Sequence, residues 1–286
     1  MKAPLPDSLA AAFPKRPVDM HKYAAGVVTV IGGSTRYSHA PVIAALGARA
    51  GGAGLVQLAV PDASRAAAGA LVPEATFADF SSNVIPPRTD VTALGMGLGD
   101  DPDGEALVAR VLSNSGRFVV DASALTILAR LRAADALPSV EGRTLILTPH
   151  VGEAARLLDC STDEIQTDRS AAVHRLMERY RAVVVLKGPH TLVAAPDRTD
   201  MFECPAGNPF MALGGMGDLL AGALAARWAY LSKARPDPDA AFLAACGAVW
   251  LHATASDALV AADPPGDPSI VNTAHALASI RVALEK

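Results

Sequence analysis

The clearest pattern along the chain is a series of short apolar runs, rich in β-branched residues and closed by Gly, Pro or Asp. Runs without polar alternation are typical of strands that are covered on both faces. A weaker pair of runs flanks a turn at Pro196 and predicts an edge hairpin formed by Thr191–Ala194 and Met201–Cys204. The six strands predicted to be buried are Val27–Ile31, Leu55–Val60, Val91–Leu94, Phe118–Asp121, Leu145–Leu147 and Val183–Leu186.

Between these runs lie Ala-rich stretches with the spacing of helices. Strands that alternate with helices predict parallel strands joined by right-handed crossovers, and so an α/β fold of three layers, α/β/α, with a mainly parallel central sheet. No linker or internal repeat interrupts the chain, so we expect one domain over residues 1–286. The predicted helices are Ala40–Ala50, Gly104–Ser115, Leu125–Ala133, Gly152–Leu158, Arg169–Tyr180, Asp218–Leu231, Ala240–Ala262 and Thr273–Glu285, and the last ones form a helical layer.

Composition narrows the function classes. Hydrophobic residues make up 51% of the 286 residues, which is enough for a sizeable core, and the formal net charge of −4 gives no reason to expect a nucleic acid or a membrane as partner. Cys160, Cys204 and Cys246 are widely separated and form no C-x-x-C pair, and no histidine pair has a zinc-like spacing. We therefore expect reduced thiols, no metal site built from protein ligands, and, with no secretory leader, a cytoplasmic enzyme.

The segment Gly207–Asp218 is the strongest candidate for chemistry, because it is rich in glycine and runs directly into a predicted helix. Glycines allow backbone N–H groups to converge, and the N-terminus of the helix adds the positive end of its dipole, so the segment predicts a site for a phosphate. A Walker A loop is excluded, since no Gly-Lys-Ser/Thr follows. The alternative is that Asp218 only caps the helix.

Other loops at predicted strand ends carry weaker signals. Lys187 and Gly188 follow one strand, where a lysine can meet a nucleotide phosphate, and His150 closes another strand with Glu153 in the next helical turn. The run Gly95–Gly99 follows a third strand but does not have the G-x-G-x-x-G spacing. Since ligands of open α/β sheets bind beyond the carboxyl ends of the strands, the joint occurrence of these loops predicts one site at that edge.

In this order the segments resemble the ADP/ATP-dependent NAD(P)H-hydrate dehydratase family, a branch of the ribokinase-like fold, as a stand-alone dehydratase domain. The resemblance covers roughly residues 20 to 260, and its specificity lies in the ordered set rather than in any one motif. The matching pieces are His21-Lys22, Gly32-Gly33-Ser34 with Tyr37 and Ala40-Pro41, Gly52–Val56, Pro73-Glu74, Gly97–Gly99, Asp121-Ala122 with Ala124-Leu125, Thr148–His150 with Gly152-Glu153, Leu186–Gly188 and Gly207–Asp218.

The resemblance implies a metabolite-repair function: dehydration of the hydrated cofactors NADHX and NADPHX to NADH and NADPH, with ADP or ATP as phosphoryl donor and Mg²⁺ bridging the phosphates. It implies that Asp218 is the catalytic base and that a homo-oligomer, commonly a tetramer, forms. The residues that it assigns are Ala40, Gly97, His150 and Asp218 for the hydrate, Lys187, Gly188, Pro189, His190, Thr191 and Gly217 for the nucleotide, and the amides of Gly215, Met216 and Gly217 for the anion hole.

The sequence departs from the family pattern inside these motifs. Ser123 stands where the family has a second aspartate, and Met216 and Leu213 replace smaller or polar residues beside Asp218. Two alternatives follow, a small-molecule kinase on the same fold and a non-catalytic nucleotide-binding homologue. The kinase does not need the Ala40-Pro41 and Thr148–His150 motifs, and the binder has no need of a base at Asp218. The residues do not decide between ADP and ATP as donor, but a compact stand-alone domain without a targeting segment favours an ADP-dependent (S)-NAD(P)H-hydrate dehydratase.

Overall fold

A nine-stranded sheet forms the centre of the structure, a computed structural model that describes residues 4–80, 85–137, 139, 141–235 and 239–286. The strand order is β3-β2-β1-β4-β5-β6-β7-β8-β9, and all strand pairs from β3 to β7 are parallel, whereas β8 and β9 run antiparallel as an edge hairpin. The mainly parallel sheet and its hairpin edge are therefore confirmed. The strands are β1 (Val27–Ile31), β2 (Leu55–Ala59), β3 (Thr76–Ala78), β4 (Val91–Leu94), β5 (Gly116–Val120), β6 (Arg143–Leu147), β7 (Val183–Leu186), β8 (Leu192–Ala194) and β9 (Phe202–Glu203).

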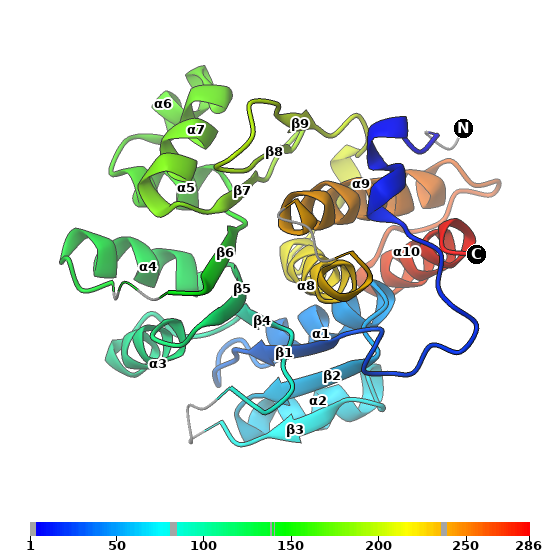
Figure 1. Cartoon of the computed structure of the whole chain (residues 1–286), viewed down its shortest axis with the longest axis horizontal. Coiled ribbons are helices and arrows are strands. Elements are labelled where there is room, and N and C mark those ends of the chain that lie inside the picture. The colour runs from blue at the N-terminus through cyan, green and yellow to red at the C-terminus, as the bar shows by residue number, and fades with distance from the viewer. Residues whose placement is uncertain (1–3, 81–84, 138, 140, 236–238) are drawn as a thin grey trace.

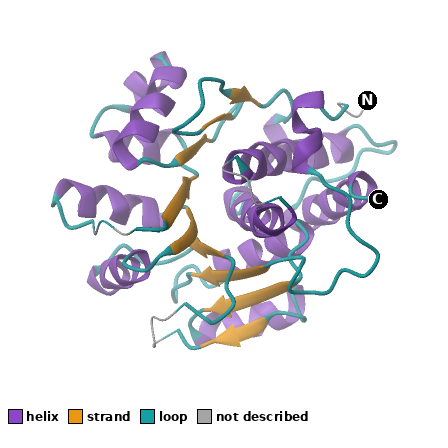
Figure 2. Cartoon of the chain, in the orientation of Figure 1, coloured by secondary structure: helices purple, strands orange, loops and turns teal. Residues whose placement is uncertain are grey.

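Helices cover both faces of this sheet and give the predicted three layers (Figures 1 and 2). Alternate residues of β5 join different cores: Val119 packs with one helical layer, and Phe118 and Val120 pack with the other. The first layer holds α1 (Ala40–Ala50), α2 (Asp62–Leu71), α8 (Met216–Ala234), α9 (Ala240–Val260) and α10 (Ile270–Leu284), and the short 3₁₀ helices η1 (Asp7–Ala12) and η2 (Pro209–Met211) lie beside α9. The second layer holds α3 (Pro102–Leu112), α4 (Ser123–Ala133), α5 (Val151–Leu158), α6 (Thr162–Thr167) and α7 (Arg169–Tyr180).

The elements that sequence analysis missed are exposed or short. In β3, Thr76 and Phe77 are exposed, so this strand lacks the apolar run of its neighbours. In α2 only Ser64 and Ala68 are buried, and α6 has six residues. The predicted start of α3 at Gly104 was two residues late, because the helix begins at Pro102 and the side chain of Asp101 caps it by accepting from the Gly104 amide at 2.9 Å.

The helices α1 and α8 pack against each other with almost no space between their backbones. A Cβ atom at Gly47 would lie 2.1 Å from the Leu219 carbonyl oxygen, and one at Gly222 would lie 1.8 Å from the Ala44 carbonyl oxygen. Both distances are far inside van der Waals contact, so only glycine is accommodated at these two positions. The two glycines therefore set the separation of the two helices.

The helix α9 is long and apolar enough to span a membrane by length and composition. However, 72% of its most apolar window is buried inside the protein, between α8, α10 and the sheet. Packing in the core therefore accounts for its apolar composition.

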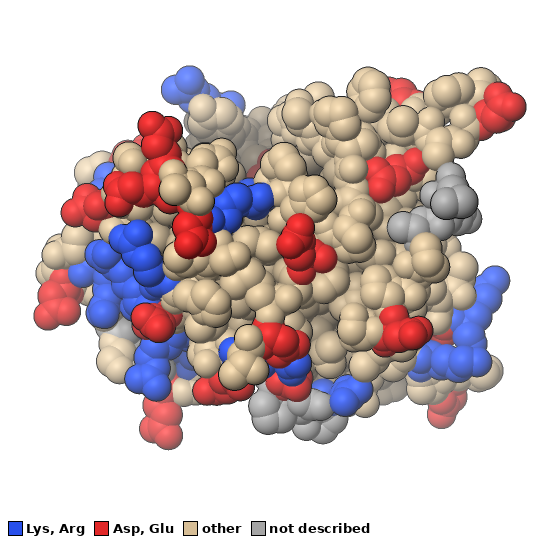
Figure 3. All heavy atoms as spheres, turned by 90° about the horizontal axis from the view of Figure 1, so that it is seen from above, with Lys and Arg blue, Asp and Glu red and all other residues tan. Residues whose placement is uncertain are grey.

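On the face shown in Figure 3, acidic and basic side chains of the described residues lie intermixed.

Candidate active site

An ion pair between Asp121 and Lys187 lies at the carboxyl edge of the sheet. Asp121 directly follows β5 and is 1% exposed, and its Oδ1 lies 2.6 Å from Lys187 Nζ, which follows β7. Thr148, at the end of the intervening strand β6, donates its hydroxyl to the same oxygen at 2.8 Å. Burial alone would lower the pKa of Lys187, but the carboxylates of Asp121 and Glu153 outweigh it and raise the pKa. Lys187 is therefore a permanently charged centre of the site.

A capping box at the start of α5 brings a second carboxylate to this lysine. The His150 amide donates to Glu153 Oε2 at 2.8 Å, and the Gly152 amide donates to His150 Nδ1 at 3.0 Å. Glu153 Oε2 also lies 3.8 Å from Lys187 Nζ. Burial raises the pKa of Glu153 to about 7, although the positive charge of Lys187 acts in the opposite direction. For His150, burial and the charge of Lys187 act together and lower the pKa. At neutral pH, His150 is an uncharged hydrogen-bonding group and Glu153 exchanges a proton readily.

The N-terminus of α8 points at the same cluster. Gly215 precedes the helix with φ +98°, and a Cβ atom there would lie 2.9 Å from Ile43 Cδ1. A Cβ atom at Gly217 would lie 3.3 Å from Lys187 Nζ, so the first turn of α8 touches the ion pair. The first-turn amides of a helix have no carbonyl partner one turn earlier and are available to an anion, although the Met216 amide already donates to the Leu213 carbonyl at 3.2 Å.

Asp218 occupies the third position of α8 rather than the cap. The N-cap is Gly215, and no side chain makes a capping hydrogen bond there, so the interpretation of Asp218 as a mere cap is wrong. Burial raises the pKa of Asp218 to about 7, with a further rise from the negative charge of Asp121, while Lys187 opposes the shift. A carboxylate with a pKa near neutrality is suited to accept a proton and to release it again in each turnover.

Met216 does not place its bulk over this anion site. Its side chain is 4% exposed and belongs to the hydrophobic core between α8 and the sheet. The departure at this position therefore changes core packing and leaves the backbone of the first turn in place. Ser123, the other departure, is the first residue of α4, two residues after Asp121.

A second group of predicted residues lies next to the ion pair. Gly97 has φ +69°, and a Cβ atom there would lie 2.5 Å from the Tyr37 carbonyl oxygen and 2.8 Å from Ala40 Cβ. Ala40 and Gly97, both expected to contact the hydrate, are thus in contact with each other. The same loop reaches the ion pair through Gly95, where a Cβ atom would lie 2.1 Å from the carbonyl oxygen of Asp121.

Sequence reasoning did not assign a site role to Asp121, Thr148 or Glu153, although all three lie in the motifs that carry the resemblance. The available signal was their position at the end of a buried strand or in the first turn of the following helix. It also missed Arg169, whose guanidinium donates to the carbonyl groups of Leu186 and Pro189. No sequence pattern marks that residue.

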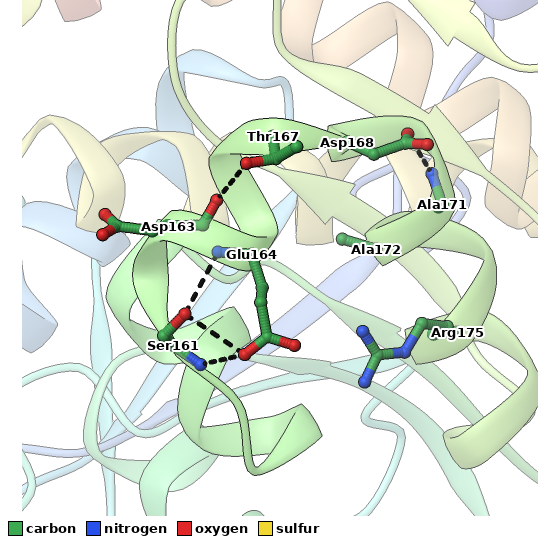
Figure 4. A pocket seen from close by; sticks show the side chains of 8 residues that line it. All are labelled: Ser161, Asp163, Glu164, Thr167, Asp168, Ala171, Ala172 and Arg175. Atoms are coloured by element: carbon green, nitrogen blue, oxygen red, sulfur yellow. Dashed lines mark hydrogen bonds between the residues drawn. The ribbon is translucent and has the colours of Figure 1, made fainter.

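A separate hollow of about 380 Å³ lies between α6 and α7 (Figure 4). Its polar groups serve as helix caps: Ser161 Oγ accepts from the Glu164 amide at 3.2 Å, and Asp168 Oδ1 accepts from the Ala171 amide at 2.8 Å. Hydrogen bonds from Ser161 also lower the pKa of Glu164. Local helix capping explains these side chains, so we place the active site at the edge of the sheet instead.

Comparison with known proteins points to one family. The chain is 37% identical to the bifunctional NAD(P)H-hydrate repair enzyme Nnr of Gloeobacter violaceus, over 90% of this chain and 50% of the relative, so it spans about half the length of that protein. It is 37% identical to the ADP-dependent (S)-NAD(P)H-hydrate dehydratase of Neisseria meningitidis serogroup B, over 86% of this chain and 81% of the relative. The crystal structure of the ADP/ATP-dependent NAD(P)H-hydrate dehydratase from Bacillus subtilis, co-crystallized with ATP/Mg²⁺, has a TM-score of 0.81 at 26% identity and covers 97% of this chain and 96% of that one.

The family model described as NAD(P)H-hydrate dehydratase matches residues 28–275, which include all of the sheet except Val27 and every residue of the site described above. The chain belongs to the NAD(P)H-hydrate dehydratase family.

Proposed function

We propose that this chain converts the hydrated cofactors NADHX and NADPHX to NADH and NADPH, with ADP or ATP as phosphoryl donor. The observation that carries the proposal is the position of Asp218 in the first turn of α8, beside the Asp121–Lys187 ion pair and with a pKa raised to about 7. The names of the relatives support the same reaction. A pure nucleotide-binding protein has no need of a base at this position.

The reaction is a phosphorylation followed by an elimination. Asp218 accepts the proton of the C6 hydroxyl while the hydroxyl oxygen attacks the terminal phosphorus of the donor. The bond from that phosphorus to the bridging oxygen breaks, which releases AMP from ADP or ADP from ATP. The ring nitrogen lone pair then expels phosphate from C6. Loss of the C5 proton restores the C5–C6 double bond, and the balance is hydrate plus ADP to reduced cofactor, AMP and phosphate. The elimination needs phosphorylation because hydroxide is a poor leaving group.

The N-terminus of α8 supports the charge of the transferring group. Its free first-turn amides and helix dipole attract an anion, and Lys187 adds a full positive charge next to Gly217. We assign the loop Lys187–Thr191 and Gly217 to the nucleotide. We assign Ala40, Gly97, His150 and Asp218 to the hydrate, since Ala40 and Gly97 already touch and His150 is neutral at physiological pH.

Mg²⁺ fits this site as an ion held mainly by phosphate oxygens and water. Among the described residues no group of three or more His, Cys, Asp or Glu side chains is arranged to hold a metal by itself. Asp121 and Glu153 offer carboxylate oxygens, the ligand type that Mg²⁺ prefers, and Mg²⁺ usually keeps several waters. Asp121 and Glu153 are the residues that would hold the ion, and when bound it would neutralise part of the charge of the phosphates.

The proposal is tested by mixing the purified protein, Mg²⁺ and chemically hydrated NADH or NADPH with ADP or ATP, and by following the return of absorbance of the reduced ring. We expect recovery with at least one nucleotide and none without nucleotide. A folded protein that restores no absorbance with either donor contradicts the function. Homo-oligomerisation, to a tetramer, and a cytoplasmic location stay predictions, and light scattering measures the first.

A further inference from the structure

In the loop Lys187–Thr191, which connects β7 to β8, the carbonyl groups of Gly188, Pro189 and Thr191 accept hydrogen bonds from protein donors. The Thr191 hydroxyl donates to the Gly188 carbonyl at 2.9 Å, and the Cys204 amide donates to the Thr191 carbonyl at 2.9 Å. The Lys187 amide donates to the Pro149 carbonyl at 2.8 Å, which anchors the start of the loop to the strand-end loop after β6. In the described part of the chain, by contrast, the amides of Gly188 and His190 have no protein acceptor.

Arg169 holds two further carbonyl groups of this connection. It is the first residue of α7, and its guanidinium donates to the Leu186 carbonyl at 3.2 Å and to the Pro189 carbonyl. A Cβ atom at Gly188 would lie 3.2 Å from the same guanidinium, so the arginine lies directly under the turn. Burial lowers the pKa of Arg169, and Glu203 opposes this, but a guanidinium remains protonated at neutral pH.

The direction of the His190 amide follows from the contact between Arg169 and the Pro189 carbonyl. In a planar trans peptide the C=O and N–H groups point in opposite directions, so fixing the Pro189 carbonyl on Arg169 turns the His190 amide away from the arginine. His190 is held in this conformation, with φ +53°, and its ring Nδ1 lies 3.1 Å from Glu203 Oε1. The loop thus presents the His190 amide on the side away from Arg169, where an acceptor group of a ligand can meet it.

We propose that Arg169 is a positioning residue for the nucleotide: it does not touch the ligand but orients the His190 amide in the loop that binds it. The inference rests on the proposed function, in which this loop holds a nucleoside di- or triphosphate. A planar guanidinium can donate to two carbonyl groups at once, whereas a lysine ammonium is a point charge on a flexible stem, so lysine is expected to replace it only in part.

The test compares Arg169→Ala, Arg169→Gln and Arg169→Lys with Arg175→Ala, which removes an exposed arginine from the same helix. Calorimetric titration with ADP and Mg²⁺ gives the nucleotide Kd without turnover, and kinetics give kcat and the KM for the hydrate at saturating nucleotide. We expect Arg169→Ala to weaken ADP binding by about tenfold or more, Arg169→Lys to weaken it less, and Arg175→Ala to leave it unchanged. The hydrate KM and kcat should change little.

Amide hydrogen exchange of residues 187–191 supplies a second readout. ADP should slow exchange in the wild type, and slow it less in Arg169→Lys. This comparison tests the positioning role even if Arg169→Ala does not fold. If a folded Arg169 variant binds ADP with an unchanged Kd, whether or not its melting temperature is lower, the positioning role is overturned. Wild-type protein that binds ADP but restores no reduced cofactor contradicts the proposed function alone, and wild-type protein that binds no nucleotide contradicts both.

Discussion

The raised pKa of Asp218 predicts an unusual pH profile. A carboxyl group with a pKa of about 7 is ionised in about one molecule in ten at pH 6 and in about nine in ten at pH 8. Because only the ionised form accepts the proton of the hydroxyl, kcat/KM for the hydrate should rise about tenfold over this interval. An aspartate at its ordinary pKa would be fully ionised throughout, and the profile would be flat.

Glu153→Gln tests how much a neighbouring carboxylate contributes to this rising limb. Burial and Asp121 are the larger causes of the raised pKa of Asp218, and the carboxylate of Glu153 adds to them, so its removal should move the rising limb toward lower pH. Glutamine keeps an oxygen that can accept from the His150 amide, so the capping box of α5 is preserved. Since Glu153 itself has a pKa of about 7, the wild-type limb reports the pair of carboxyl groups.

The assay is the return of absorbance of the reduced ring at saturating nucleotide, measured from pH 5.5 to pH 9 in buffers of constant ionic strength. Melting curves at each pH ensure that the enzyme is folded. A wild-type profile that is flat between pH 6 and pH 8 refutes the raised pKa. A limb that stays in place in Glu153→Gln refutes the electrostatic coupling.

Three other predictions follow from the site. Asp218→Asn should reduce turnover about a hundredfold or more while calorimetry still detects ADP binding, and equal rates in variant and wild type would exclude Asp218 as the base. The raised pKa of Asp218 means that its ionised form, present at high pH, destabilises the folded state. Asparagine removes this cost, so the variant should raise the melting temperature more at pH 8 than at pH 5. Gly97→Ala forces a Cβ atom to within 2.5 Å of the Tyr37 carbonyl oxygen, so the hydrate KM should rise and the free energy of unfolding should fall by about 1–3 kcal/mol, and an unchanged KM would argue against contact with the hydrate. Met216→Ala should lower the free energy of unfolding in denaturant by about 2–5 kcal/mol with little change in kcat, whereas a large gain in kcat would show that the methionine obstructs the site.

The central sheet was predictable because its strands are uninterrupted apolar runs that need cover on both faces. Strand β3 and helix α2 were not, since Phe77 and most of α2 face solvent and carry no such pattern. The ion pair shows a different limit. Asp121 and Lys187 each stand at the end of a recognisable strand, but they meet only because β6 alone separates β5 from β7 in the sheet, and strand order is a property of the whole fold.

The remaining site features depend on side-chain direction. From the sequence, Met216 is a bulky residue inside a phosphate loop, and only the geometry of α8 shows that it enters the core. Arg169 lies at the start of a polar helix beside exposed residues. Its proposed role depends on hydrogen bonds to two carbonyl groups about twenty residues further along the chain. Such backbone contacts leave no trace in residue spacing.

The glycine contacts between α1 and α8 have a consequence for how the enzyme moves. Ala40 begins α1 and Asp218 lies in the first turn of α8, so the two glycines that hold these helices together also fix the distance between the proposed hydrate contact and the proposed base. We expect these helices to form one rigid body that cannot slide to admit or release a ligand. Entry and exit of the cofactor must then depend on the loops that lead into them, residues 33–39 and 207–215, whose motions would set the pace of turnover.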